Sequence, residues 1–258
     1  MKFLLFIALL CASATFSASA AQCPSSQFAD GQPPRIVVTA LSRDARSLCS
    51  SFFSVLYSGI SRTPLYSAEH LTAESVDQAR EQSRINSFHA DPRLPYGTGP
   101  TLADYAHSGF DRGHMSPNGD MPDRQSQHES FALTNMVPQN PNNNRHLWAA
   151  IESTTRAMAE QSGGAYVVTG PAFLGNVSRI GNVAVPNYLW KAVYLPRAGR
   201  HGIAAAWYTP NAAGKSFEVI SIDELIRRVG IDPFPGIPPQ VKSAGARFAY
   251  PSERTHYQ

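Results

Sequence analysis

The sequence predicts an α+β fold, built as one domain around a central antiparallel β-sheet flanked by helices. Strand-like and helical segments are mixed along the chain without the steady β–α–β alternation that a parallel sheet requires. The clearest strand segments are 165–169, 188–195 and 202–208. They are rich in Val, Tyr and Trp and are separated by turn residues, which favours antiparallel pairing.

The elements before these strands follow from local patterns. Segments 51–56 and 64–71 have the composition of early strands. Thr72 can cap a helix over residues 73–84, which is rich in Glu, Gln and Ala. A longer helix is predicted from Asn144 or Arg145 to Gln161, because apolar residues recur there at helical spacing and a Gly-Gly pair ends the pattern.

A strand over 217–220 and a helix over 222–229, capped by Ser221, complete the predicted elements. Beyond them, four prolines are expected to exclude further helix: Pro233, Pro235, Pro238 and Pro239. The tail over 242–258 is expected to be loosely held.

Residues 1–21 have the layout of a cleavable secretory signal peptide. Lys2 supplies a positive charge, the run from Phe3 to Leu10 is apolar but too short to span a bilayer, and small residues follow. No later stretch is long and apolar enough to cross a membrane. We therefore expect a secreted or periplasmic product with no membrane partner, consisting of residues 22–258.

Two cysteines remain after the signal peptide, Cys23 and Cys49. In an oxidising compartment such a pair predicts one disulfide, which would tether a lead-in over residues 22–50. The alternative is a pair of buried thiols.

The net charge is less informative than the preference for arginine over lysine. The formal net charge is only +3, but of 22 basic residues four are lysine. The planar guanidinium of arginine suits bidentate phosphate contacts. A GC-rich genome gives the same bias, so composition alone leaves both explanations open.

The segment 108–123 contains the residues best suited to phosphodiester chemistry. Such cleavage needs a base, a cation and hydrogen-bond donors that hold the phosphate. Arg112, Gly113 and His114 supply a phosphate fork, a flexible backbone and a base that titrates near neutral pH. Asp111 can accept hydrogen bonds beside them. The acids that follow, Asp120, Asp123 and Glu129, are expected to be solvated.

The predicted helix adds a second set of polar residues. Asn144, Trp148, Glu152 and Arg156 follow one another at i,i+4 spacing and would share one face. An amide oxygen with water suits a hard cation such as Mg²⁺. The spacing equally allows Asn144 to be a helix cap, and Glu152 with Arg156 to be a surface ion pair.

Together, these motifs resemble the DNA/RNA non-specific endonuclease family of ββα-metal (His-Me finger) nucleases. The match comprises D-R-G-H at 111–114, T-N-M-V-P-Q at 134–139 and N-N-R-x-x-W-x-x-x-E-x-x-x-R at 143–156. The resemblance implies a ββα-metal motif in the fold, and the similarity continues more weakly from about Pro64 to Phe234.

By this resemblance, His114 is the general base and Asn144 is the direct ligand of one hydrated Mg²⁺, for which Mn²⁺ can substitute. Glu152 would hold metal-bound water, and Arg112 and Arg156 would contact phosphate. The implied reaction is endonucleolytic hydrolysis of DNA and RNA to products with 5′-phosphates.

The family also has an upstream phosphate-binding arginine in an R-x-x-x-F setting. Arg84 with Phe88 fits this setting, whereas Arg80 and Arg93 are close competitors. Asn135 matches a family asparagine that shapes the site and is expected to be supporting, like Asp111.

Two other functions fit parts of the sequence. A nucleic-acid-binding module with a degenerate nuclease fold should have lost His114 or Asn144, and both are present. A small-molecule phosphodiesterase would need a closed pocket rather than an open groove lined by arginines. The sequence specifies neither a protein inhibitor nor an oligomeric state.

Overall fold

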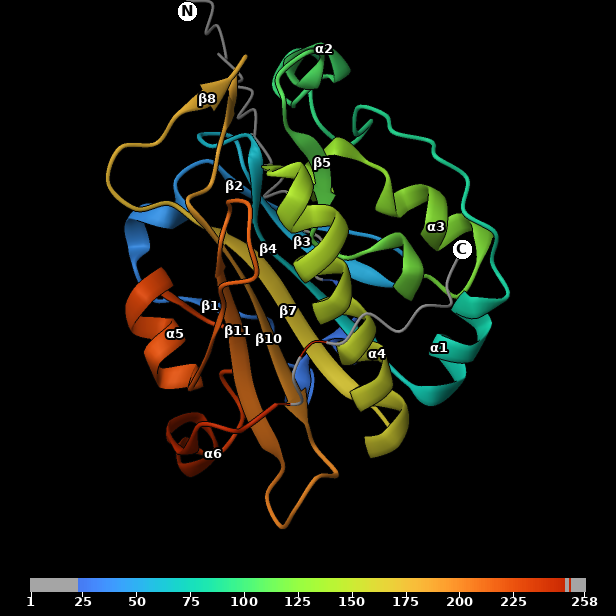
Figure 1. Ribbon diagram of the computed structural model, residues 1–258, viewed down its shortest axis with the longest axis vertical. Coiled ribbons are helices and arrows are strands. Elements are labelled where there is room, and N and C mark those ends of the chain that lie inside the picture. Colours follow the sequence, from blue (N-terminus) through green and yellow to red (C-terminus); the bar gives the residue numbers. More distant parts are fainter. Residues whose placement is uncertain (1–22, 249–250, 252–258) are drawn as a thin grey trace, which may run out of the picture.

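The computed structural model describes residues 23–248 and 251 (Figure 1). The predicted signal peptide and the end of the predicted tail lie outside these residues. Within the described part of the chain, no helix combines the length and the apolar character needed to cross a bilayer.

A seven-stranded antiparallel sheet forms the centre of the molecule, so the predicted α+β class is confirmed. Its strands lie in the order β12-β11-β10-β7-β4-β3-β2. Their bounds are β2 Ala45–Cys49, β3 Phe53–Ser58, β4 Thr63–Leu71, β7 Ala165–Ala172, β10 Tyr188–Leu195, β11 Ile203–Pro210 and β12 Glu218–Ile220. Strand β10 has the predicted bounds, and the other predicted strands are shifted by a few residues.

Helices cover both faces of this sheet (Figure 1). On one face, α4 (Ala149–Ser162) and α1 (Ala73–Arg80) pack with a core that includes Val167, Val193 and Trp207. On the other face, α5 (Ile222–Val229) and α6 (Pro239–Ala244) pack with alternate residues of the same strands, such as Val168. This alternation follows from the two-residue period of a strand, because neighbouring side chains point to opposite faces.

Shorter elements connect the main ones. Three two-stranded antiparallel pairs lie outside the large sheet: β5 (Asp111–His114) with β6 (Met136–Gln139), β8 (Arg179–Ile180) with β9 (Val183–Ala184), and β1 (Arg35–Ile36) with β13 (Ile231–Asp232). The short helices are α2 (Leu102–Tyr105) and α3 (Arg124–Ser130), and a π-helical turn over Asn143–Trp148 leads into α4. Single 3₁₀ turns lie at Ser25–Gln27, Ala29–Gly31, Thr39–Ser42, Asn118–Asp120 and Leu133–Asn135.

The predicted lead-in ends in a strand that the sequence did not predict. The predicted disulfide joins Cys23 to Cys49 and is confirmed. Residues 45–49 form β2, the edge strand of the large sheet. The disulfide therefore attaches the start of the described chain to a sheet edge.

The prediction that prolines exclude helix after residue 233 is wrong. Helix α6 begins at Pro239, and a proline is tolerated in the first turn because its missing N–H has no partner there. Lys242 was placed at the start of a loosely held tail. It is instead buried in this helix and donates to Asp232 at 2.8 Å.

Candidate active site

A cleft of about 840 Å³ lies beside the β5–β6 pair, between the end of α1 and the start of α4. It brings together residues that are far apart in the sequence. Those singled out above that line it are Arg80, Arg84, Asp111, Arg112, His114, Asn144, Glu152 and Arg156. Asn135 and Arg93 do not line it, and each has a role outside the cleft wall that is described below.

The pairing of β5 with β6 aligns the strand that carries His114 with the start of α4. Gly113 pairs with Val137, and a Cβ at position 113 would lie 1.9 Å from Gln139 Oε1. Only glycine therefore leaves room for the Gln139 side chain. That side chain donates from Nε2 to Asn143 Oδ1 at 2.8 Å. The amide of Gln139 thus joins β6, the strand paired with that of His114, to the residue next to Asn144.

Asn135 fixes the chain directly after His114. Its carbonyl oxygen accepts from Met115 N at 2.9 Å, and its Oδ1 accepts from Ser116 N at 3.0 Å. Its Nδ2 donates to the carbonyl oxygens of Ser116 and Ser130 at 2.8 and 2.9 Å. Asn135 is buried, so its contribution is to hold the backbone of this loop.

His114 lies in an aromatic enclosure with only 8% of its surface exposed. Its ring meets the edge or face of Phe131 at 5.0 Å and of Phe88 at 5.7 Å between centroids. Burial, with the charges of Arg84 and Arg112, lowers the pKa of His114 to about 3. Its Nε2 has no hydrogen-bond partner among the described residues. The imidazole is therefore neutral at neutral pH.

The side chain of Asn144 is oriented by Asp111. Its Nδ2 donates to Asp111 Oδ2 at 3.0 Å, and Arg145 donates to both oxygens of the same carboxylate at 2.9 and 2.8 Å. Burial alone would raise the pKa of Asp111, but these bonds outweigh that effect and hold the pKa below its usual value. Because the amide nitrogen is used in this way, the amide oxygen is the atom that remains for a cation.

The predicted face of the helix needs one correction. Trp148 does not line the cleft but is fully buried in the core against the sheet. The π-helical turn over Asn143–Trp148 adds a residue to the turn, so Ala149 follows Asn144 on the cleft wall. Glu152 and Arg156 then continue that wall at ordinary helical spacing.

Glu152 and Arg156 are not a plain surface ion pair. Burial raises the pKa of Glu152 to about 7, although the charges of Lys191 and Arg156 oppose this shift. Arg156 donates to Asp120 at 2.7 Å, and Asp120 is only 1% exposed. The expectation that Asp120 is a solvated loop acid is therefore wrong, because α4 supplies it with a buried cation.

Two further charged residues beneath the cleft were missed from the sequence. Glu69 and Lys191 are buried on the sheet face that carries α4, and Lys191 donates to Thr169 at 2.8 Å. Burial and the charge of Asp120 raise the pKa of Glu69 well above its usual range. A charged residue inside an otherwise apolar strand was the available signal for both.

The three candidate arginines lie in different surroundings. Arg84 lines the cleft, with its guanidinium 5.4 Å from the centre of the Phe131 ring. Arg80 also lines the cleft, but it is ion-paired with Asp77 and Glu160. Arg93 is bound to Asp91 outside the cleft.

The model of the DNA/RNA non-specific endonuclease family matches residues 31–240. The chain belongs to this family. The endonuclease is 37% identical over 176 residues to nuclease C1 of Cunninghamella echinulata var. echinulata, covering 62% of this chain and 69% of that one. It is 30% identical over 229 residues to a nuclease of Nostoc sp., covering 83% and 82%.

A solved structure shares the fold of the endonuclease. It is described as the crystal structure of the EndoG/EndoGI complex, on the mechanism of EndoG inhibition, and superposes with a TM-score of 0.69 at 25% identity. The match covers 79% of this chain and 94% of that one. Further relatives at 31% to 34% identity are mitochondrial nucleases.

The endonuclease is thus an enzyme that hydrolyses nucleic acids, and its family depends in general on a divalent cation. The cleft has the composition to hold one. The amide oxygen of Asn144 and the carboxylate of Glu152 are hard oxygen donors of the kind that Mg²⁺ accepts together with water. Within residues 23–248 and 251, no three His, Cys, Asp or Glu side chains gather as an alternative ligand set.

Proposed function

We propose that the endonuclease cleaves DNA and RNA with little regard for sequence, using His114 as general base and one hydrated Mg²⁺ held by Asn144. The observation that carries this proposal is the neutral imidazole of His114 on the same cleft as Asn144. A base must be unprotonated and within reach of the water that it activates.

In the proposed reaction, the imidazole of His114 takes a proton from water and the resulting hydroxide attacks phosphorus. The bond from phosphorus to the 3′ oxygen breaks, that oxygen takes up a proton from solvent, and the phosphate stays on the 5′ side. Bound Mg²⁺ would neutralise charge that develops on the phosphate oxygens. Glu152 would hold a water molecule bound to that cation, and Mn²⁺ can replace Mg²⁺.

Arginines would hold the substrate by its phosphates. Arg84, Arg112 and Arg156 line the cleft, and the Arg112 guanidinium lies 4.2 Å from the centre of the Phe88 ring. Of the three upstream candidates we assign the phosphate contact to Arg84, since Arg80 is occupied by two carboxylates and Arg93 lies elsewhere. Contacts to phosphate carry no sequence information, which accounts for broad specificity.

Plasmid DNA and RNA incubated with the purified enzyme, with and without EDTA, test this function. We expect cleavage of both only when Mg²⁺ is free, with 5′-phosphates on the products. Intact substrates in excess Mg²⁺ would indicate a protein that binds nucleic acids without cleaving them. Cleavage restricted to small phosphodiesters would indicate a different enzyme class.

Variants test the individual roles. His114→Ala should remove most cleavage, and full activity would overturn the assignment of the base. Arg84→Ala should raise KM or lower kcat more than Arg80→Ala or Arg93→Ala does. Asn144→Ala should weaken Mg²⁺ binding, so that cleavage needs more Mg²⁺, and an unchanged Mg²⁺ requirement would point to another ligand.

We also propose that the enzyme acts after export, as residues 22–258. The Cys23–Cys49 disulfide supports an oxidising compartment. Sequencing the N-terminus of the protein recovered from periplasm and from medium tests both export and cleavage after Ala21. An uncleaved N-terminus in the cytoplasmic fraction would contradict the proposal.

A further inference from the structure

Arg93 joins two distant parts of the chain. Its Nε and Nη2 donate to the two oxygens of Asp91 at 2.8 and 2.6 Å, and its Nη1 donates to the carbonyl oxygen of Cys49 at 2.7 Å. Asp91, whose side chain is fully buried, also accepts from Thr134 Oγ1 at 2.5 Å. A continuous set of charge-assisted bonds therefore runs from the end of β2 to Thr134.

A second set of bonds leaves the same end of β2. The backbone nitrogen and the hydroxyl of Ser51 donate to Glu129 Oε2 at 2.7 and 2.5 Å. Glu129 belongs to α3, and the next residue, Ser130, accepts from Asn135 Nδ2 at 2.9 Å. This set reaches Asn135 from the opposite side to Thr134.

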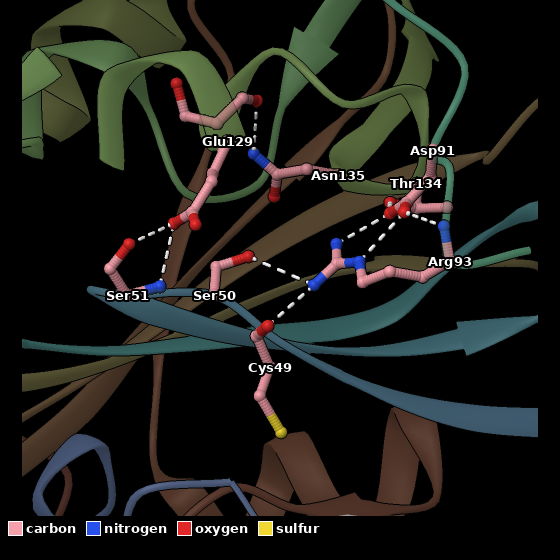
Figure 2. Close-up of polar contacts among 9 residues, drawn as sticks. Cys49, Ser50, Ser51, Asp91, Arg93, Glu129, Thr134 and Asn135 are labelled. Carbon is pink, nitrogen blue, oxygen red and sulfur yellow. Dashed lines mark hydrogen bonds and ion pairs between the residues drawn. The ribbon is translucent and has the colours of Figure 1, made fainter. Parts of the chain in front are cut away.

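Figure 2 shows both sets converging on neighbouring residues, Thr134 and Asn135, from the segment 49–51. Asn135 in turn holds the nitrogens of Met115 and Ser116, the two residues directly after His114. At its other end the segment is fixed by the Cys23–Cys49 disulfide and by the edge strand β2.

We propose that Arg93 and Glu129 are positioning residues for His114, acting as the two arms of a brace between the disulfide-bonded end of β2 and the loop that carries the histidine. The proposal rests on the proposed function, in which His114 is the base. Neither Arg93 nor Glu129 lines the cleft, so the proposal gives neither of them a contact with the substrate.

The brace has a physical reason to affect turnover more than binding. Of the arginines proposed to hold phosphate, Arg84 and Arg156 are carried by other segments and Arg112 precedes His114 on β5. The bonds of the brace reach only the backbone after His114, through Asn135. A shift of about 1 Å in a reacting group can lower a rate by about 10²-fold. Loosening the brace should therefore lower kcat while KM stays nearly unchanged.

Arg93→Gln, Glu129→Ala and the double variant test the brace, with steady-state cleavage of a fluorogenic oligonucleotide as the assay. Each single change should lower kcat by about 5-fold and the double change by up to about 10²-fold, with KM within about twofold of wild type. Arg93→Lys should restore less than half of the kcat that Arg93→Gln loses, because an ammonium cannot span both oxygens of Asp91.

The matched control is Arg228→Gln. Arg228 is 29% exposed, against 33% for Arg93, and also binds a carboxylate with two nitrogens, that of Glu218. It lies on α5, on the other face of the sheet. We expect its kcat to equal that of wild type. An equal fall in kcat for this control, or wild-type kcat in a folded double variant, would overturn the proposal.

Amide hydrogen exchange supplies a readout that does not need catalysis. The amides of Met115 and Ser116 should exchange at least about tenfold faster in Arg93→Gln than in Arg228→Gln, since their acceptors on Asn135 become mobile. Equal exchange refutes the brace. If the wild type does not cleave nucleic acid but these amides exchange faster in Arg93→Gln, the proposed function is wrong and the brace stands. If the double variant does not fold, Thr134→Val tests the Arg93 arm, because it removes the hydroxyl that donates to Asp91 while nearly keeping the shape of the side chain.

Discussion

The buried imidazole of His114 should leave a measurable trace in the dependence of stability on pH. Its pKa is lowered to about 3 in the folded protein, whereas in the unfolded chain it returns near its ordinary value of 6.5. Between these values the unfolded chain binds a proton that the folded protein does not. The free energy of unfolding therefore falls as the pH falls from 6.5 towards 3. Linkage gives a loss of about 2 kcal/mol between about pH 6 and about pH 4 from this group.

His114→Gln removes the titrating group and keeps a polar side chain of similar size. Urea unfolding in EDTA, followed by tryptophan fluorescence, gives the free energy of unfolding at both pH values. We expect the variant to lose about 2 kcal/mol less than wild type between them. Comparison with wild type is needed because Glu152, whose folded pKa is raised to about 7, changes stability in the opposite sense over the same range.

His201→Gln, a change at an exposed histidine, is the control and should follow wild type. Equal losses in wild type and His114→Gln would show that the fold does not hold this imidazole neutral. The inference of a base that is ready before substrate arrives would then fail.

Three further changes probe the architecture around the cleft. Gly113→Ala must displace Gln139 and should lower the free energy of unfolding by about 1 to 3 kcal/mol in the same urea assay, and unchanged stability would mean that Gln139 yields freely. Asp120→Asn removes the carboxylate charge that pairs with Arg156 and should lower kcat/KM by about tenfold or more, and a wild-type value would show that Arg156 keeps its place unaided. Glu152→Gln removes a carboxyl whose folded pKa is raised, so wild type should lose stability relative to this variant as the pH rises from 4.5 through about 7 in metal-free buffer. A constant difference over that range would contradict the raised pKa.

The motif residues were expected at one site because their order and spacing together resemble a known family. Periodicity predicted the helix that carries Glu152, but it did not predict the short strand that carries His114. The same periodicity misplaced Trp148, since a π-helical turn changes the residues that share a face and leaves no mark in the hydrophobic pattern.

The remaining errors concern partners that local patterns do not contain. The burial of Asp120 depends on Arg156, which is 36 positions away and belongs to another element. The edge strand β2 was missed because its residues, A-R-S-L-C, form a strand through pairing with β3 rather than through their own composition. Helix α6 was excluded by a rule for prolines in the interior of a helix, whereas Pro239 stands at its first turn.

The widened turn at the start of α4 sets a limit on how this region can vary in length. A π-helical turn is equivalent to one residue inserted into an α-helix. Deleting one residue within Asn143–Trp148 would restore a regular helix, but Asn144 and Trp148 could then no longer both keep their present directions. A relative that is one residue shorter here must either turn its amide away from the cleft or withdraw its tryptophan from the core. Insertions and deletions should therefore be far rarer in these six residues than in the loops on either side.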